Sequence, residues 1–250
     1  MIEIFKNSFR YFRQLVLRFR VLKTTPFNVN SNSILIIAPH PDDETFGCAG
    51  LIAKKVKAGA HISVAFLTYG ENSLDESPDT EIATNRQKTS ETVCSVLGVK
   101  NVYYCGFSDS NIPRRGMDDY TSGVEKIVQL IEQIDPKEVF CTHDSEGWSD
   151  HTAAAELTFD ALKRINKMIA LYYYWVWVWL SIPLKKTNLL DFNNTFYLPI
   201  TDVMDQKCLA ISTYLSNVDA QGNPYCGELP KMFLKAFEWP YEVYEKVEYK

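Results

Sequence analysis

The sequence lacks the patterns that define several common protein classes. Its six cysteines are scattered and none belongs to a Cys-x-x-Cys pair, which excludes a disulfide framework and a thiolate zinc site. It has no run of roughly 18 uncharged apolar residues, so no membrane-spanning helix is predicted. Its first residues also lack the apolar core and cleavage site of a signal peptide. We therefore expect a cytoplasmic protein.

Positive charge is scarce outside the first segment of the chain. The formal net charge is −5, but residues 1–23 carry six basic side chains against one glutamate, a net +5. The rest of the chain therefore carries about −10. An acidic main domain argues against nucleic-acid binding, and no nucleic-acid partner is expected.

Residues 2–22 are predicted to form an amphipathic helix. Apolar residues recur at steps of three and four and make one narrow face, namely Ile2, Phe5, Phe9, Phe12, Val16 and Phe19. Pro26 and an Asn/Ser-rich segment then separate this basic helix, residues 1–25, from a single domain over 33–250. The helix either docks on the body or on a second subunit, or lies peripherally on an anionic membrane surface.

From residue 33 onward, short apolar runs alternate with helical patterns. Predicted strands cover 33–38, 61–68, 101–104 and 138–142, and predicted helices cover 47–58, 81–97, 118–134 and 151–165. This rhythm predicts an α/β fold, a Rossmann-like three-layer sandwich with a mostly parallel sheet whose strands all end at one edge. The last third is expected to add strands at 171–180 and 193–198 and helices at 202–214 and 229–236. These segments are expected to complete the edge of the sheet and to wall the cleft.

The segment from His40 through Asp42 and Asp43 to Glu44 directly follows the first buried strand. Ligands of open α/β sheets bind at this edge. His40 and Asp43 are three residues apart, so both can face one point if a helix begins there. An imidazole and a carboxylate together suit Zn²⁺.

A third ligand must come from the remaining histidines, His61, His143 and His151. His61 opens a predicted strand at the opposite edge and is expected to be structural. His151 follows the 138–142 strand at a loop-to-helix junction, on the same edge as His40. Two histidines, one carboxylate and an open position indicate one catalytic zinc per chain. Asp42, next to a ligand, is the predicted general base for a zinc-bound water that attacks an amide.

These residues resemble the His-Pro-Asp-Asp-Glu motif of the PIG-L/LmbE-like N-deacetylases. The resemblance runs from about Ile34 to Tyr214 and includes a Thr-Tyr-Gly-Glu turn at 68–71 and a Gly-Phe-Ser-Asp loop at 106–109. It implies an LmbE-like fold and a zinc enzyme that removes the acetyl group of an N-acetylglucosamine-type sugar. It also implies His40, Asp43 and His151 as metal ligands.

The resemblance assigns roles to further residues. Arg86 and Asp109 are candidate substrate contacts, and Asp150 matches an acidic residue that orients or tunes groups near the metal. Many bacterial members have a histidine where this chain has Trp148, and that histidine aids the oxyanion or the leaving group. Either His143 takes over this role or it is structural. Trp148 either stacks on a sugar or anchors the loop.

The sequence thus predicts a deacetylase for an acetamido sugar, with lipid-linked and nucleotide-linked carriers both open. Two other classes compete with this hypothesis, a non-catalytic sugar-binding protein on the same scaffold and another metal-dependent hydrolase. The intact Asp42 argues against the first, and two-histidine ligation argues against a two-metal phosphoesterase. The loops 70–82, 108–120 and 182–193 are expected to select the substrate.

Overall fold

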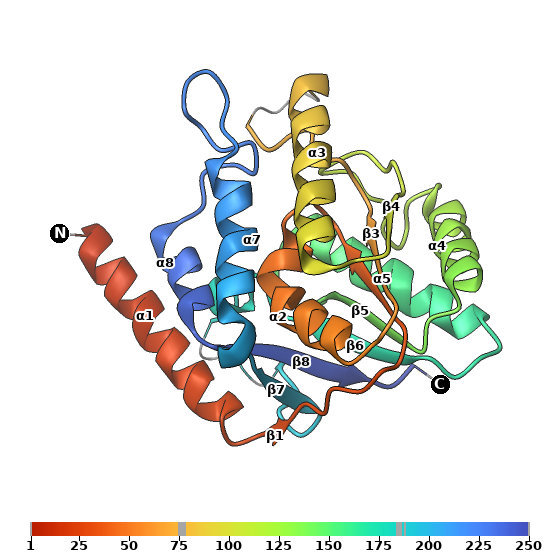
Figure 1. The fold of residues 1–250 in the computed structure, drawn as a ribbon, viewed down its shortest axis with the longest axis horizontal. Helices are drawn as coiled ribbons and strands as arrows, with labels where there is room; N and C mark the ends of the chain where they lie inside the picture. Colours follow the sequence, from red (N-terminus) through yellow and green to blue (C-terminus); the bar gives the residue numbers. More distant parts are fainter. Residues whose placement is uncertain (1, 75–78, 184–186, 188, 250) are drawn as a thin grey trace.

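The computed structural model describes residues 2–74, 79–183, 187 and 189–249, with side chains from residue 7 onward. It contains one eight-stranded sheet in the order β1-β7-β8-β6-β5-β2-β3-β4 (Figure 1). The strands are β1 Thr25–Pro26, β2 Ile34–Ala38, β3 Ile62–Phe66, β4 Asn101–Tyr104, β5 Glu138–Thr142, β6 Ala170–Tyr174, β7 Thr195–Pro199 and β8 Tyr241–Val247. The α-helices are α1 Ile2–Val21, α2 Asp43–Lys57, α3 Thr80–Leu97, α4 Tyr120–Ile134, α5 Ser149–Arg164, α6 Val178–Ser181, α7 Met204–Ser216 and α8 Lys231–Leu234. Short 3₁₀ segments cover Thr201–Val203 and Lys235–Glu238.

Five strands, β2 to β6, form a continuous parallel block. β2 pairs in parallel with β3 and β5, β3 pairs with β4, and β5 pairs with β6. β8 is antiparallel to both of its neighbours, β6 and β7. The predicted three-layer α/β sandwich with a mostly parallel sheet is confirmed.

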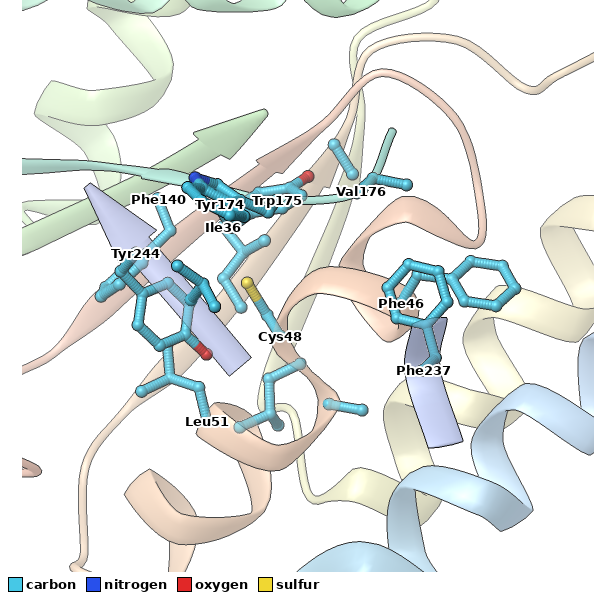
Figure 2. Close-up of a cluster of buried hydrophobic side chains, with 14 of the residues drawn as sticks. Ile36, Phe46, Cys48, Leu51, Phe140, Tyr174, Trp175, Val176, Phe237 and Tyr244 are labelled. Carbon is cyan, nitrogen blue, oxygen red and sulfur yellow. The ribbon is translucent and has the colours of Figure 1, made fainter. Parts of the chain in front are cut away.

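Both faces of the sheet are covered, because successive side chains of a strand point to opposite faces. In β2, Ile34 and Ile36 join one buried cluster, and Leu35 and Ile37 join the other. The first cluster packs under α2, α3 and α7, and the second under α4 and α5 (Figure 1). Figure 2 shows part of the first cluster, where Cys48 of α2 lies among strand side chains such as Ile36. This double burial explains the uninterrupted apolar strands.

The aromatic run 171–180 is not a single strand, so that prediction is wrong beyond Tyr174. β6 ends at Tyr174, and α6 begins at Val178. The Glu146 carboxylate accepts hydrogen bonds from the backbone N–H groups of Val176, Trp177 and Val178, at 2.6, 2.8 and 3.2 Å. These amides therefore have a partner other than a neighbouring strand, and the chain turns out of the sheet.

The strand β8 was not predicted, because its pattern depends on partners distant in the sequence. Glu242 is buried beside Val243, which breaks the alternation of a half-buried strand. Its carboxylate accepts the N–H groups of Gly50 and Leu51, both at 2.8 Å, and pairs with Lys207 at 2.6 Å. A buried carboxylate with such partners is satisfied, so the strand tolerates it.

The N-terminal helix α1 docks on the body, but not through the predicted apolar face. Phe9, Phe12 and Phe19 are exposed, whereas Leu17 and Val21 are buried. The side chains of Ile2 and Phe5, also assigned to that face, lie outside the described residues. Among the residues that the structure describes, no helix has the length and apolarity needed to cross a bilayer.

Candidate active site

The predicted site residues converge at the carboxyl edge of the parallel strands. β2 leads directly to His40 and Asp43, β4 leads to Asp109, and β5 leads to the first turn of α5 with Asp150 and His151. All five line one cavity of about 300 Å³. That volume is within the range of small-molecule sites.

His40, Asp43 and His151 offer three ligand atoms that lie within 4.8 Å of one another. His40 Nδ1 is 3.2 Å from Asp43 Oδ2, and His151 Nε2 is 3.4 Å from Asp43 Oδ1. Two imidazole nitrogens and one carboxylate oxygen form a donor set that suits zinc and leaves a coordination position open. The chemistry of these three groups fits a single catalytic metal ion.

The other ring nitrogen of each histidine meets a carboxylate. His40 Nε2 is 3.2 Å from both Asp150 Oδ2 and Asp109 Oδ1. His151 Nδ1 is 2.6 Å from Glu146 Oε2, and Glu146 is fully buried. Carboxylates in this position fix the tautomer and orientation of a metal-binding histidine. Sequence reasoning missed Glu146, for which the only local signal is an acid in the same loop as His151.

Negative charge dominates the surroundings of the two histidines. The carboxylates of Asp42, Asp43, Asp109, Glu146 and Asp150 lie around them. Burial alone lowers the pKa of His40, but hydrogen bonds with Asp109, Asp150 and Asp43 outweigh it and raise that pKa well above 6.5. The electrostatics thus favour a cation between the carboxylates, and a divalent metal held by the three ligands meets this demand.

Asp42 adopts a backbone conformation that is rare for residues other than glycine, with φ 136° and ψ −30°. The strained turn is held by Glu44, whose Oε2 accepts the Asp42 N–H at 2.9 Å and whose Oε1 accepts the Tyr214 hydroxyl at 2.8 Å. Such strain persists only where the surroundings fix it, and it is typical of active sites. Here it aims the Asp42 side chain into the cavity beside Asp43.

The Asp42 carboxyl has the protonation behaviour of a general acid–base. Burial raises the pKa of Asp42 to about 8, the charge of Arg86 opposes this rise, and the neighbouring Asp43 adds to it. A carboxyl whose pKa lies near neutrality can both take up and return a proton. A bound metal ion would lower this pKa and favour the basic form.

Arg86, a predicted substrate contact, is almost fully buried in α3. Its Nη2 donates to Asp42 Oδ2 at 3.1 Å and to the carbonyl of Pro41 at 2.7 Å. A Cβ at Gly70 would lie 2.5 Å from the guanidinium carbon, so this turn requires glycine. Arg86 therefore holds the Asp42 carboxylate in place. It also lines the cavity, and its contact with substrate stays a prediction.

Trp148 forms an exposed wall of the cavity. Its side chain is 53% exposed and packs against Trp177, with ring centroids 5.1 Å apart. The segment 226–229 and Phe233 of α8 complete this side of the cavity. The last third of the chain was expected to wall the cleft, and its residues Leu229 and Phe233 do line the cavity, whereas the described part of the loop 182–193 supplies no lining residue. An exposed indole beside the metal ligands is suited to stacking on a sugar face, which stays a prediction.

His143 is placed away from the metal ligands, although it follows the same strand as His151. Its side chain is buried, with Nε2 at 3.2 Å from Glu245 and Nδ1 at 3.2 Å from Asp144. It is not among the described residues that line the cavity. This position favours the structural alternative over a role at the oxyanion.

The ion pairs of His143 predict a measurable pH dependence. Burial alone lowers its pKa, but hydrogen bonds with Asp144 and Glu245 raise it to about 9. The stabilisation of the folded state by the ion pairs of protonated His143 is therefore fully present below pH 6.5 and is lost as the pH rises through about 9. We expect the difference in unfolding free energy between wild type and His143→Gln to shrink by roughly 1–3 kcal/mol over this range. Urea denaturation at both ends of the range measures it, and a pH-independent difference would contradict the assignment.

Replacing Glu146 by glutamine should weaken metal binding more than it destabilises the fold. The glutamine side chain keeps an oxygen that can accept the backbone N–H groups after β6. The substitution removes the negative charge that orients His151. We expect a loss of roughly 10–100-fold in zinc affinity, measured by competition with a chelator. Glu228→Gln, at an exposed carboxylate of the same cavity, is the control. Unchanged zinc affinity with a lower melting temperature would assign Glu146 to folding alone.

Known proteins share both the sequence pattern and the fold. The family model described as PIG-L, GlcNAc-PI de-N-acetylase, matches residues 35–162, about half of the chain. The chain belongs to the PIG-L family. One relative, a diacetylchitobiose deacetylase from Thermococcus kodakarensis, is 27% identical to this chain over 225 residues. The match covers 86% of this chain and 80% of that protein. PIG-L deacetylases are metal-dependent, and His40, Asp43 and His151 form the candidate metal site of this member.

Solved structures similar to this PIG-L chain show the same fold. The N,N′-diacetylchitobiose deacetylase from Pyrococcus horikoshii superimposes with a TM-score of 0.64 at 20% identity, covering 86% of this chain and 84% of that one. The 4-carboxy-2-hydroxymuconate hydratase from Pseudomonas putida gives a TM-score of 0.63 at 16% identity, covering 88% and 97%. The fold is therefore shared by enzymes with different reactions, and the residues of the site must decide the function.

Proposed function

We propose that this protein is a zinc-dependent N-deacetylase that hydrolyses the acetamido group of an amino sugar and binds one zinc ion per chain. The decisive observation is the pairing of a complete donor set, His40, Asp43 and His151, with a strained, buried Asp42 beside it. The membership in the PIG-L family and the named deacetylase among its relatives support the same reaction.

The residues of the site account for each proton movement. Zinc, when bound, would supply a Lewis acid that polarises the amide carbonyl and acidifies water. Asp42 accepts a proton from the attacking water as the bond between its oxygen and the acetyl carbon forms. It then delivers this proton to the sugar nitrogen as the carbon–nitrogen bond breaks, which releases acetate and a free amine. Arg86 keeps the carboxylate of Asp42 in position throughout.

The size and charge of the cavity support a neutral sugar as substrate and argue that a charged carrier would lie outside it. About 300 Å³ accommodates one acetamido sugar unit, with Trp148 and Trp177 as aromatic surfaces for its ring. The carboxylates Asp109 and Asp150 can accept hydrogen bonds from hydroxyl groups, but they repel a phosphate. A lipid-linked or nucleotide-linked sugar would therefore bind with its phosphate beyond the cavity mouth.

A panel of acetamido sugars tests the proposal. Zinc-loaded protein is incubated with N-acetylglucosamine, diacetylchitobiose and nucleotide-linked and lipid-linked N-acetylglucosamine, and acetate and primary amine are measured. We expect both products in equal amounts from at least one substrate. Binding of these sugars without any acetate would indicate a sugar-binding protein and overturn the proposal.

Another metal-dependent reaction is the second candidate, and the shared fold of the hydratase is the observation that favours it. The substrate of that enzyme is a carboxylated acid, whereas the present cavity is lined by aspartates. Among the described residues that line the present cavity, the one arginine is Arg86. It is already paired with Asp42. An anionic substrate is thus disfavoured by the charge of the cavity, while a neutral acetamido sugar is not.

We also propose that residues 1–23 contact either a membrane surface or another subunit.

A further inference from the structure

The face of helix α1 that packs on the body contains polar as well as apolar side chains. Arg13 donates to the carbonyls of Trp179 and Ile182 at 3.0 and 3.2 Å, and Gln14 donates to the carbonyl of Met232 at 2.7 Å. Both side chains are buried. The helix is therefore attached to the body through these polar groups together with the buried side chains of Leu17 and Val21, whereas most of its large apolar side chains are exposed.

The outward face of α1, defined by Phe9, Tyr11, Phe12, Leu15 and Phe19 together with Leu22 directly after the helix, is an exposed apolar surface. These six account for half of the twelve large apolar side chains that are exposed in the described part of the chain. Phe12 is 56% and Phe19 63% exposed. Scattered exposed apolar residues need no explanation, but a contiguous group of aromatic rings on one helix indicates a binding surface.

Positive charge surrounds this outward face. Arg18 donates to the carbonyls of Lys235 and Ala236, and Arg20 donates to the hydroxyl of Thr187. These partners are uncharged, and within the described part of the chain neither guanidinium forms a direct ion pair, although the nearby charge of Glu238 acts on Arg18. The ammonium group of Lys235 lies over the ring of Tyr11, 5.4 Å from its centroid, and extends the basic border onto the body.

We propose that the outward face of α1 docks on the surface of an anionic lipid bilayer. Aromatic side chains between basic groups suit the headgroup region, where rings enter the acyl boundary and cations meet phosphates. The remainder of the chain carries about −10 and is repelled by such a surface, so charge orients the protein with α1 toward the lipid. Symmetric pairing of two α1 helices would instead bring two basic segments together.

Docking through α1 would bring the cavity close to the bilayer. Gln14 holds the backbone of α8 at Met232, and the next residue, Phe233, lines the cavity. Figure 1 shows α1 and α8 side by side. The outward face of α1 is separate from the candidate metal ligands. A result that shows no membrane binding would therefore leave the proposed deacetylase activity untouched.

Vesicle flotation of the full-length protein tests the proposal. The vesicles contain phosphatidylcholine alone or a mixture with phosphatidylglycerol. We expect at least about tenfold stronger partitioning into the mixed vesicles, weakened by salt. The double variant Phe12→Ser, Phe19→Ser should lose at least about tenfold of this partitioning. The matched control is Val96→Ser, Met168→Ser, which removes two exposed apolar side chains elsewhere and should bind like wild type.

Three results would overturn the proposal. They are equal partitioning into both kinds of vesicle, equal loss in the control variant, and no binding by the intact protein. Light scattering after size exclusion is run on the same samples. A dimer of the wild type that dissociates in the Phe12→Ser, Phe19→Ser variant, without vesicle binding, would assign the outward face to a second copy of the chain.

Discussion

Asp42→Asn should lower the rate of amide hydrolysis by about 10²–10⁴-fold while the protein keeps its metal and its fold. The substitution removes the proton acceptor but preserves shape. Asparagine also tolerates positive φ better than most residues, so the strained turn at φ 136° is retained. The loss should therefore fall on kcat, because the group acts only while bonds are changing.

Stability provides an independent readout for the same variant. Burial is the largest cause of the raised pKa of Asp42, and the charge of Arg86 opposes it. Asparagine keeps an oxygen that can accept the Arg86 hydrogen bond and carries no charge that burial would penalise, so the melting temperature should change little even as activity falls. Asp205→Asn, at an exposed site on α7, serves as control and should keep full activity. Undiminished hydrolysis by Asp42→Asn would remove Asp42 from the mechanism.

Removing the metal should abolish hydrolysis and destabilise the protein together. Without a cation, the carboxylates around His40 and His151 repel one another, and a metal that binds only the folded state stabilises it by mass action. We expect dialysis against a chelator to lower the melting temperature by several degrees, about 2–4 °C for each 1 kcal/mol lost. Added zinc should restore both stability and activity.

The histidines supply a matched pair of variants for this experiment. His151→Ala removes a candidate ligand at the carboxyl edge and should prevent zinc from restoring activity. His61→Ala is the control, because His61 is exposed at the opposite edge, where its Nε2 meets the Asn101 side chain at 2.9 Å. Elemental analysis should find about one zinc per chain in His61→Ala and far less in His151→Ala. Equal zinc content in the two variants would disprove the ligand assignment.

The parallel part of the fold could be predicted because its signals are local. Each apolar strand is followed by an amphipathic helix, and the carboxyl ends of such strands must share an edge. This rule alone brings His40 and His151 together across more than 100 residues, and the structure places both at one cavity. Asp42 was predicted as the general base because it lies next to a candidate ligand in the sequence, and this role stays a prediction.

The features that sequence reasoning missed depend on contacts between distant segments. Glu242 looks like a surface residue of a weak strand until Lys207 and the amides of α2 are placed around it. Glu146 looks like a loop acid until the chain after β6 returns to it. The partner of the apolar face of α1 was left open between the body, a second subunit and a membrane, because a pattern of apolar residues shows that a face exists but not where it points.

Glu146 also links the affinity for the metal to the shape of the cavity wall. One of its oxygens orients the ligand His151, and the other receives the amide of Trp177, whose side chain forms part of the cavity wall. A rearrangement of this wall for a different sugar would shift the carboxylate and, through it, the imidazole. Homologues that diverge in substrate at the segment after β6 should therefore differ in metal affinity as well.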